Sequence, residues 1–350
     1  MGISRDKISK AIFKKLASYV DSANSSYQYD LKKCYIDFQE KDKEALDTVR
    51  NERIQGFIPN AKFAVICYKQ KDILIVLGEQ ESEHDGSVLL NLEMDLAMFV
   101  YAIYALDGAV NDTKPPLEIY NELLCQPEDE YYHGHCLEDM QDAFEHVNAY
   151  EIVSGGSLDQ TDVYNVYAYH FLVLERESVG RWEEDTLELF ERVILSGNNK
   201  IPYHNIVMSM LANQWNHSFL ETYRCIERMF HIIRLEPFYD ELGTKLTLLE
   251  VSEKIEDKIS WRPDEKSAIR DIFQAVKTMG FVEEIEKVKC SYKEVKGMRI
   301  DNWYYQVRNS IAHYRAVHKP VSFTREEWNC LLRFNLYTIE YLYEQYRNKL

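Results

Sequence analysis

Apolar and polar residues follow a helical period through residues 201–350. Apolar side chains recur there every three or four positions, which places them on one face of a helix. Proline, glycine and capping residues divide this pattern into four or five helices with short connections, as in a helical bundle. The predicted helices are residues 206–235, ended by Pro237; residues 242–259; a third, opened by Pro263, Asp264 and Glu265 and ended by Gly280; residues 301–318, capped by Asp301 and followed by Pro320; and a last helix opened by the capping box at residues 324–327.

The first 200 residues mix this helical period with a period of two, which indicates an α+β fold. Two β-branched runs, residues 61–68 and 73–77, predict strands joined by a hairpin at the polar residues 69–72. Residues 88–106 are apolar nearly all round and predict a buried helix, with room for a strand before it. The other predicted elements are a helix at residues 12–19, a strand or helix edge at 29–38, a strand at 163–174 and an acidic helix at 183–195.

The predicted domain boundary lies at residues 196–199, where Ser-Gly-Asn-Asn ends the acidic helix. The fold class is therefore an α+β N-terminal domain, residues 1–200, followed by an all-α helical bundle, residues 201–350. Charge divides at the same place. Residues 1–200 hold 19 Lys and Arg against 37 Asp and Glu, a net charge of −18, whereas residues 201–350 hold 22 against 21. The acidic part should repel a phosphate backbone, and the neutral part permits a local basic site.

Cysteine usage and hydropathy indicate a cytoplasmic protein without a membrane association. The seven cysteines are scattered, with no Cys-x-x-Cys pair, which is typical of reduced, mostly buried thiols. The first twenty residues are charged and amphipathic and do not resemble a signal peptide. The longest apolar run, residues 96–106, is too short to span a bilayer.

The fourth predicted helix carries the residues most suited to chemistry. At about 100° per residue on a helix, Asn309 and His313 lie one turn apart on one side of the apolar stripe. Arg308 lies on the opposite flank of that stripe, with Arg315 on the same side as Arg308. For Arg308 to share a site with His313, it must reach round the helix or meet His313 across a dimer. The apolar stripe itself comprises Trp303, Val307, Ser310, Ile311 and Tyr314.

Arg308-Asn309-x-x-x-His313 resembles the R-x4-H signature of HEPN domains, with a polar residue straight after the arginine. The context is also similar: an aromatic-rich first helix, Phe219 to Phe230, a late motif helix, and one further amphipathic helix. The resemblance covers about the last 150 residues. It implies a homodimer with facing motif helices, RNA cleavage that leaves a 2′,3′-cyclic phosphate and a 5′-hydroxyl, and a role as a toxin or effector in defence against phage.

Metal-independent cleavage of RNA suits these residue types. The 2′-hydroxyl can attack the adjacent phosphate if a base removes its proton, and histidine is the natural base near neutral pH. Arginine remains charged and can bind phosphate in a bidentate manner. His313 is therefore the expected base, Arg308 the expected phosphate ligand, and Asn309 a group that orients either one. Arg224 and Arg315 are expected RNA contacts, with Glu227 as a supporting polar residue.

Two alternatives remain open. Arg308 and His313 could instead cap carbonyls, or pair with Glu221 or Glu227 across the bundle. The domain would then be a catalytically inactive HEPN-like module for dimerisation or binding. Arg224 and Glu227 could likewise form a salt bridge within the bundle.

Other polar clusters carry no identifiable chemistry. His133, His135 and Cys136, with His146, lack the second ligand pair of a zinc site, and residues 154–157 lack the strand and lysine of a phosphate loop. Residues 183–185 are interpreted as a solvated helix N-terminus. No metal and no cofactor are expected. Residues 1–200 are interpreted as a regulatory or sensing domain that binds a protein or small-molecule trigger.

Overall fold

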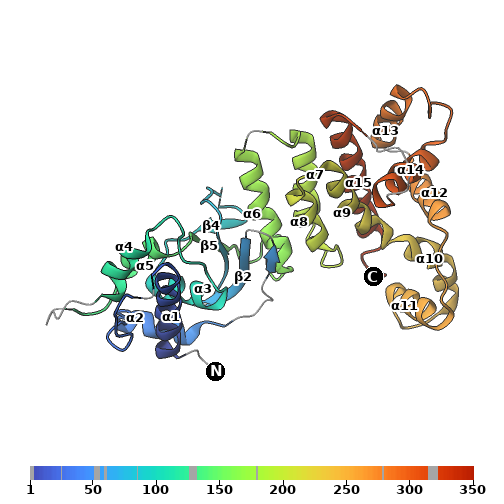
Figure 1. Ribbon diagram of the computed structural model, residues 1–350. Helices are drawn as coiled ribbons and strands as arrows, with labels where there is room; N and C mark the ends of the chain where they lie inside the picture. The colour runs from blue at the N-terminus through green and yellow to red at the C-terminus, as the bar shows by residue number, and fades with distance from the viewer. Residues whose placement is uncertain are drawn as a thin grey trace. The chain divides into compact units, whose positions relative to one another are not determined.

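The computed structural model describes residues 4–24, 26–50, 56–58, 61–84, 86–125, 132–178, 180–277, 280–313 and 322–350. Contacts within the chain gather into two compact units, Met1–Tyr167 and Ala168–Leu350, called here the N-terminal unit and the C-terminal unit. Among the described residues, every strand belongs to the N-terminal unit, and the C-terminal unit is built from helices (Figure 1). The predicted α+β part followed by a helical part is therefore confirmed in outline.

The N-terminal unit contains one antiparallel sheet with the strand order β1-β2-β3-β5-β4. The strands predicted at residues 61–68 and 73–77 are its central hairpin, and Tyr68 pairs with Lys71 at the turn. Lys69 and Gln70 have φ values of 50° and 66°, which matches the twist that a two-residue hairpin requires. The strands are β1 Gly56–Ile58, β2 Ala61–Tyr68, β3 Lys71–Leu77, β4 Leu89–Asn91 and β5 Val147–Ile152.

A buried helix packs against this sheet, as the apolar stretch at residues 88–106 predicts. Helix α3 contacts β5 of the sheet, and α1, α2 and α5 also pack against α3. Its residues from Leu96 to Ile103 are all buried, because neighbours surround it. The predicted helix at residues 12–19 is the middle of the longer α1. Residues 29–38 form an irregular segment, in which Ile36 makes an isolated bridge to His135. The helices of this unit are α1 Arg5–Ala23, α2 Glu40–Thr48, α3 Leu96–Ala105, α4 Pro116–Ile119, the π-helical turn η1 Tyr120–Leu124, and α5 Leu137–Ala143.

The strand predicted at residues 163–174 is wrong, because this segment is helix α6, Val163–Glu177. The Asp162 side chain accepts a hydrogen bond from the Tyr164 N–H, and the Asp162 carbonyl accepts from the Val166 N–H, so the helix has a clear start. Residues 165–170 are all buried. A helix without an exposed polar stripe shows no helical period in its sequence, and its aromatic and β-branched residues then resemble a strand.

The C-terminal unit contains more and shorter helices than the sequence pattern predicts. The single helix predicted at residues 206–235 is three helices, with breaks after Leu211 and after Glu227. Pro237 does not end the last of these but lies inside it. Gly280 begins a helix that was not predicted, instead of ending the one before. The helices are α7 Glu184–Leu195, α8 Tyr203–Leu211, α9 Trp215–Glu227, α10 Phe230–Leu242, α11 Leu248–Ile259, α12 Glu265–Ala275, α13 Gly280–Ser291, α14 Ile300–Ala312 and α15 Arg325–Gln345.

Helix α15 is central to the packing of the C-terminal unit. The contacts of this helix also show that the unit begins well before residue 200. The helix begins with the predicted capping box, in which Thr324 accepts from the Glu327 N–H. It packs against α7, α9 and α13. The segment predicted as a domain boundary is tied into the same unit, because the Asn198 amide donates to the Tyr343 carbonyl at 2.7 Å. The division at Ala168 therefore places α7 with the helical bundle rather than with the acidic domain.

A buried polar network joins three of these helices. The Tyr304 hydroxyl of α14 donates to Asn335 Oδ1 of α15 at 2.6 Å. The Asn335 amide in turn donates to Thr222 Oγ1 of α9 at 2.8 Å. Asn335 and Thr222 are completely buried, and Tyr304 is nearly so. This network fixes how α14 lies against α9 and α15.

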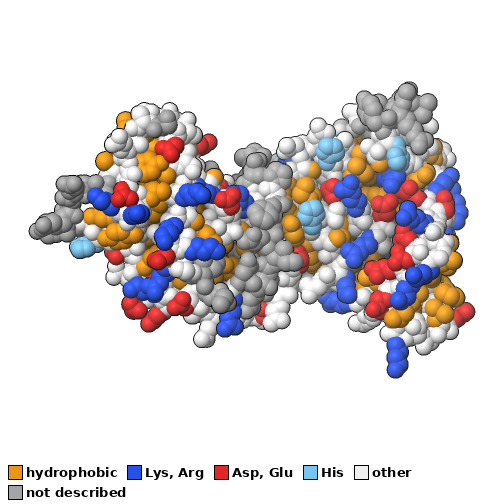
Figure 2. Space-filling model, turned by 60° about the horizontal axis from the view of Figure 1, so that its bottom comes forward, with side chains coloured by type: hydrophobic (Ala, Val, Ile, Leu, Met, Phe, Trp, Pro, Cys, Tyr) orange, Lys and Arg blue, Asp and Glu red, His pale blue; other side chains and the backbone are white. Residues whose placement is uncertain are grey.

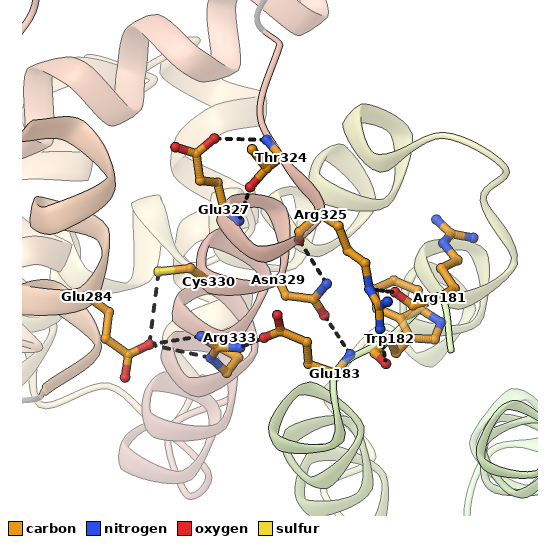
Figure 3. A network of polar contacts seen from close by, with 10 residues as sticks. All are labelled: Arg181, Trp182, Glu183, Glu284, Thr324, Arg325, Glu327, Asn329, Cys330 and Arg333. Carbon is orange, nitrogen blue, oxygen red and sulfur yellow. Dashed lines mark hydrogen bonds and ion pairs between the residues drawn. The ribbon is translucent and has the colours of Figure 1, made fainter. Parts of the chain in front are cut away.

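A second network ties the first half of α15 to the start of α7 and to α13 (Figure 3). Arg333 contacts Glu183 at 2.5 Å and Glu284 at 3.3 Å, and its side chain is 14% exposed. Arg325 donates to the carbonyls of Arg181 and Trp182. Glu183 therefore belongs to an ion-pair network and is not the solvated residue that the sequence interpretation suggests.

Replacing Arg333 with methionine should lower the free energy of unfolding of the C-terminal unit by about 2 kcal/mol. Methionine keeps much of the apolar stem but leaves Glu183 and Glu284 facing each other without a cation. The cost of breaking a fully buried pair is reduced here, because Glu284 is 40% exposed. Urea unfolding followed by tryptophan fluorescence measures this change. All five tryptophans lie in the C-terminal unit, so the signal reports on this unit alone.

Arg192→Met is the matched control for this prediction. Arg192 also joins α7 to α15, through a two-point contact with Glu340, but its side chain is 52% exposed. An exposed ion pair contributes about 0–1 kcal/mol, so this variant should unfold almost like the parent. Equal losses in the two variants would show that burial does not set the contribution of Arg333.

None of the helices in the described residues combines the length and the apolar composition that crossing a bilayer requires.

Candidate functional site

Helix α14 carries the predicted catalytic residues but ends earlier than predicted. Its N-cap is Arg299, and Asp301 lies in the first turn and pairs with Arg299. The last helical residue is Ala312, and His313 follows with an extended backbone, φ −120° and ψ 99°. His313 therefore lies just beyond the C-terminal end of the helix and not on one of its faces. Two other predicted members of this segment, Tyr314 and Arg315, lie outside the described residues.

The structure brings Arg308, Asn309 and His313 together within one chain. Arg308 Nη1 donates to Asn309 Oδ1 at 3.0 Å and lies 3.4 Å from His313 Nε2. A helical wheel places Arg308 and His313 on opposite flanks, which would need a long reach or a dimer. The contact forms within one chain, because α14 stops at Ala312 and the extended backbone at His313 places the imidazole within reach of the arginine.

Arg308 is also held by two carboxylates from other helices. Its Nη2 lies 3.2 Å from Glu227 at the end of α9, and its Nε lies 3.0 Å from Glu265 at the start of α12. The guanidinium carbon lies 5.3 Å from the centre of the Tyr223 ring, which adds a cation–π contact. The Arg308 side chain is only 14% exposed. Pairing with Glu227 confirms one of the two partners that the sequence suggests, and Glu221 is not a partner of Arg308 in the structure.

Glu265 is the residue in contact with Arg308 that sequence reasoning misses. It is the first residue of α12, where the partial positive charge of a helix N-terminus favours a carboxylate. The Tyr223 hydroxyl donates to it at 2.6 Å. Burial, together with this hydrogen bond, raises the pKa of the Tyr223 hydroxyl well above its ordinary value, so the hydroxyl remains a donor. The sequence marks Glu265 only as part of a helix start and gives no signal for its contact with Arg308.

The cluster of Arg308, Asn309, His313, Glu227, Glu265 and Tyr223 is called here the Arg308 cluster. One side of it is open to solvent, since His313 is exposed and the Glu227 side chain is 43% exposed. The opposite side is closed, because Tyr223 is 1% exposed and packs against Phe219, Phe230 and Tyr304. An imidazole beside a fixed guanidinium at an open edge can exchange a proton next to a bound anion.

Arg224 does not contact the Arg308 cluster in the structure. It lies on α9 and pairs with Glu221 three residues earlier, while its own side chain remains 58% exposed. The alternative of salt bridges within the bundle is observed for both residues, since Arg224 pairs with Glu221 and Glu227 pairs with Arg308. The Glu221 carboxylate also accepts a hydrogen bond from the Asn205 amide at 2.6 Å.

Two buried cysteines and the buried His135 have surroundings typical of core residues. Burial raises the pKa of the Cys225 thiol, and burial with the nearby Glu284 charge raises that of Cys330 to about 12, so both thiols stay protonated. His135 is a core residue, with its ring against Phe13 and its Nε2 3.2 Å from the Leu123 carbonyl. Across the part of the chain that the structure describes, no three His, Cys, Asp or Glu side chains are grouped to hold a metal ion.

The surface around the C-terminal unit is mixed in charge. Figure 2 shows Lys and Arg interspersed with Asp and Glu over the visible, described part of this unit. A protein that binds nucleic acid through charge alone usually gathers its cations on one face. The visible, described part of this unit shows no such gathering of cations. No protein-family model, curated protein or solved structure matches this chain.

Proposed function

We propose that the C-terminal unit is a metal-independent endoribonuclease of the HEPN type. The observation that carries the proposal is the contact of Arg308 Nη1 with both His313 Nε2 and Asn309 Oδ1, at 3.4 and 3.0 Å. A proton acceptor and a permanent cation stand side by side at an exposed edge, which is what cleavage by the 2′-hydroxyl requires.

In the proposed reaction, His313 takes the proton of a ribose 2′-hydroxyl. The 2′-oxygen then forms a bond to the adjacent phosphorus, and the bond from phosphorus to the 5′-oxygen breaks. The 5′-oxygen takes up a proton from solvent, so the products are a 2′,3′-cyclic phosphate and a 5′-hydroxyl. Arg308 donates to the phosphoryl oxygens, where negative charge increases in the transition state. Asn309 keeps Arg308 Nη1 turned toward His313.

The resemblance to HEPN proteins extends the proposal to the whole chain. Two copies would pair through the C-terminal unit, so that two Arg308 clusters act on one RNA. Because one chain already brings Arg308 and His313 together, pairing would add a second cluster rather than complete the first. The acidic N-terminal unit would bind the protein or small molecule that triggers cleavage, as in an effector of cytoplasmic antiviral defence.

A second function, a non-catalytic HEPN-like module for dimerisation or binding, is favoured by one observation. Arg308 is already paired with Glu227 and Glu265 and is largely buried. In this second function, the role of Arg308 is purely structural: it holds α9, α12 and α14 together.

Incubation of the purified full-length protein with total RNA or tRNA in EDTA separates the two functions. We expect the parent protein to cleave RNA and to leave 5′-hydroxyl and cyclic phosphate ends, which mass spectrometry identifies. The Arg308→Ala/His313→Ala variant should leave the RNA intact. Equal cleavage by both proteins would exclude the Arg308 cluster as the site. Intact RNA with both proteins, at concentrations where the parent binds RNA, would favour the binding module.

A further inference from the structure

The two carboxylates on Arg308 are held in very different ways. Glu265 has three favourable contacts: the N-terminus of α12, the Tyr223 hydroxyl at 2.6 Å and Arg308 Nε at 3.0 Å. Its side chain is 24% exposed. Glu227 has only its contact with Arg308 Nη2, at 3.2 Å, and its side chain is 43% exposed.

The helix ends make this difference larger. Glu227 is the last residue of α9, where the partial negative charge of the helix C-terminus disfavours a carboxylate. Glu265 is the first residue of α12, where a carboxylate is favoured. The pair between Glu227 and Arg308 Nη2 is also the one nearer to solvent, where water screens it. Glu227 is therefore the carboxylate that can leave Arg308 at low cost, and Glu265 is the one that stays.

We infer that a phosphate of single-stranded RNA exchanges with Glu227 at Arg308 Nη2, while Glu265 and Tyr223 hold the guanidinium in place. This inference rests on the proposed ribonuclease function. In the free protein, one guanidinium faces two carboxylates, and a phosphate approaching it is repelled. When Glu227 rotates into solvent, Nη2 presents its N–H donors to a phosphate oxygen, while Nε stays with Glu265 and Nη1 stays with Asn309 and His313.

The exchange gives the two glutamates separate roles. Glu227 weakens the binding of any RNA, so that only an RNA with further contacts displaces it. Glu265 is a positioning residue, because it touches Arg308 but not the substrate. The loss of Glu227 should therefore change the affinity for RNA, whereas the loss of Glu265 should change the rate of the bound complex.

Binding of a 2′-O-methyl RNA oligonucleotide tests the exchange without cleavage, because this probe lacks the attacking hydroxyl. We expect Glu227→Gln in the full-length protein to bind it about fivefold more tightly than the parent in fluorescence anisotropy. The control is Glu344→Gln, which removes the same charge from α15, where Glu344 pairs with Arg347. That control should bind like the parent. Adding Arg308→Ala to Glu227→Gln should remove the gain.

Kinetics with cleavable RNA separate the two glutamates. Glu227→Gln should lower KM by about fivefold, the same factor as the gain in binding, whereas the main effect of Glu265→Gln should be a lower kcat. Glu265→Asp keeps the carboxylate on a side chain that is shorter by one methylene. This variant should have a higher kcat than Glu265→Gln if the role of Glu265 is to position Arg308.

The outcomes distinguish this inference from the function on which it rests. Unchanged binding by Glu227→Gln, or an equal gain in Glu344→Gln, overturns the exchange, and cleavage by the parent protein would still support the ribonuclease. A gain that depends on Arg308, without cleavage by any variant, supports the exchange and counts against the ribonuclease.

Discussion

Replacing His313 with alanine should slow RNA cleavage by about 10²–10⁴-fold, the usual range for a lost general base. The imidazole is exposed, whereas Glu227 and Glu265 are paired with Arg308, so His313 is the base that we propose for the 2′-hydroxyl. His313 is exposed and lies after the last turn of α14. The free energy of unfolding should therefore stay within about 0.5 kcal/mol of the parent value.

His217→Ala is the matched control for His313, since His217 is another exposed histidine of the same unit. The cleavage rate and the tryptophan-detected unfolding curve should be measured for all three proteins. Cleavage by His313→Ala at the parent rate, with His217→Ala also unchanged, would show that another group takes the proton. Arg308→Ala is a less clean probe, because it also leaves Glu227 and Glu265 without their cation.

Replacing Asn335 with alanine should lower the free energy of unfolding of the C-terminal unit by about 3 kcal/mol. The change leaves the buried Tyr304 hydroxyl without its acceptor and Thr222 Oγ1 without its donor. It also opens a cavity among α9, α14 and α15. Burial of Tyr304 raises the pKa of its hydroxyl well above the ordinary value, so ionisation cannot relieve the loss.

A double-mutant cycle with Tyr304→Phe tests the physical reason. If the hydrogen bond carries the effect, the two changes should couple by about 1 kcal/mol or more, since the second removes a group already left unpaired. Asn348→Ala, at an exposed position of the same unit, should have almost no effect. Additive losses in the cycle would assign the effect to the cavity instead of the hydrogen bond.

The elements that could be predicted from sequence are those whose signals are local. The β2–β3 hairpin follows from two β-branched runs and a polar turn, and α15 follows from the capping box of Thr324 and Glu327. Helix α6 could not be predicted, because its burial removes the polar face that gives a helix its period. The breaks around α9 fall where the apolar period simply continues, since α8 folds back on α9 through contacts such as Ser209 with Ser218.

The candidate site shows the same limit. Arg308, Asn309 and His313 could be selected by residue type and spacing, and Glu227 by its place on a neighbouring helix. The contact of Glu265 with Arg308 depends on how α12 meets α14, which no local pattern encodes. The position of His313 was predicted for a helix that continues past this residue. Because α14 ends at Ala312, the observed position of His313 differs from the predicted one.

The early end of α14 also sets a limit on how this protein can be stabilised. Engineering commonly extends and regularises helices, because added helical turns raise stability. If α14 continued through His313, the five-residue step from Arg308 would turn the imidazole about 140° away from the guanidinium. A longer α14 would then separate His313 from Arg308 and break up the Arg308 cluster. The irregular end of α14 is thus a point where a more regular fold and an intact site exclude each other.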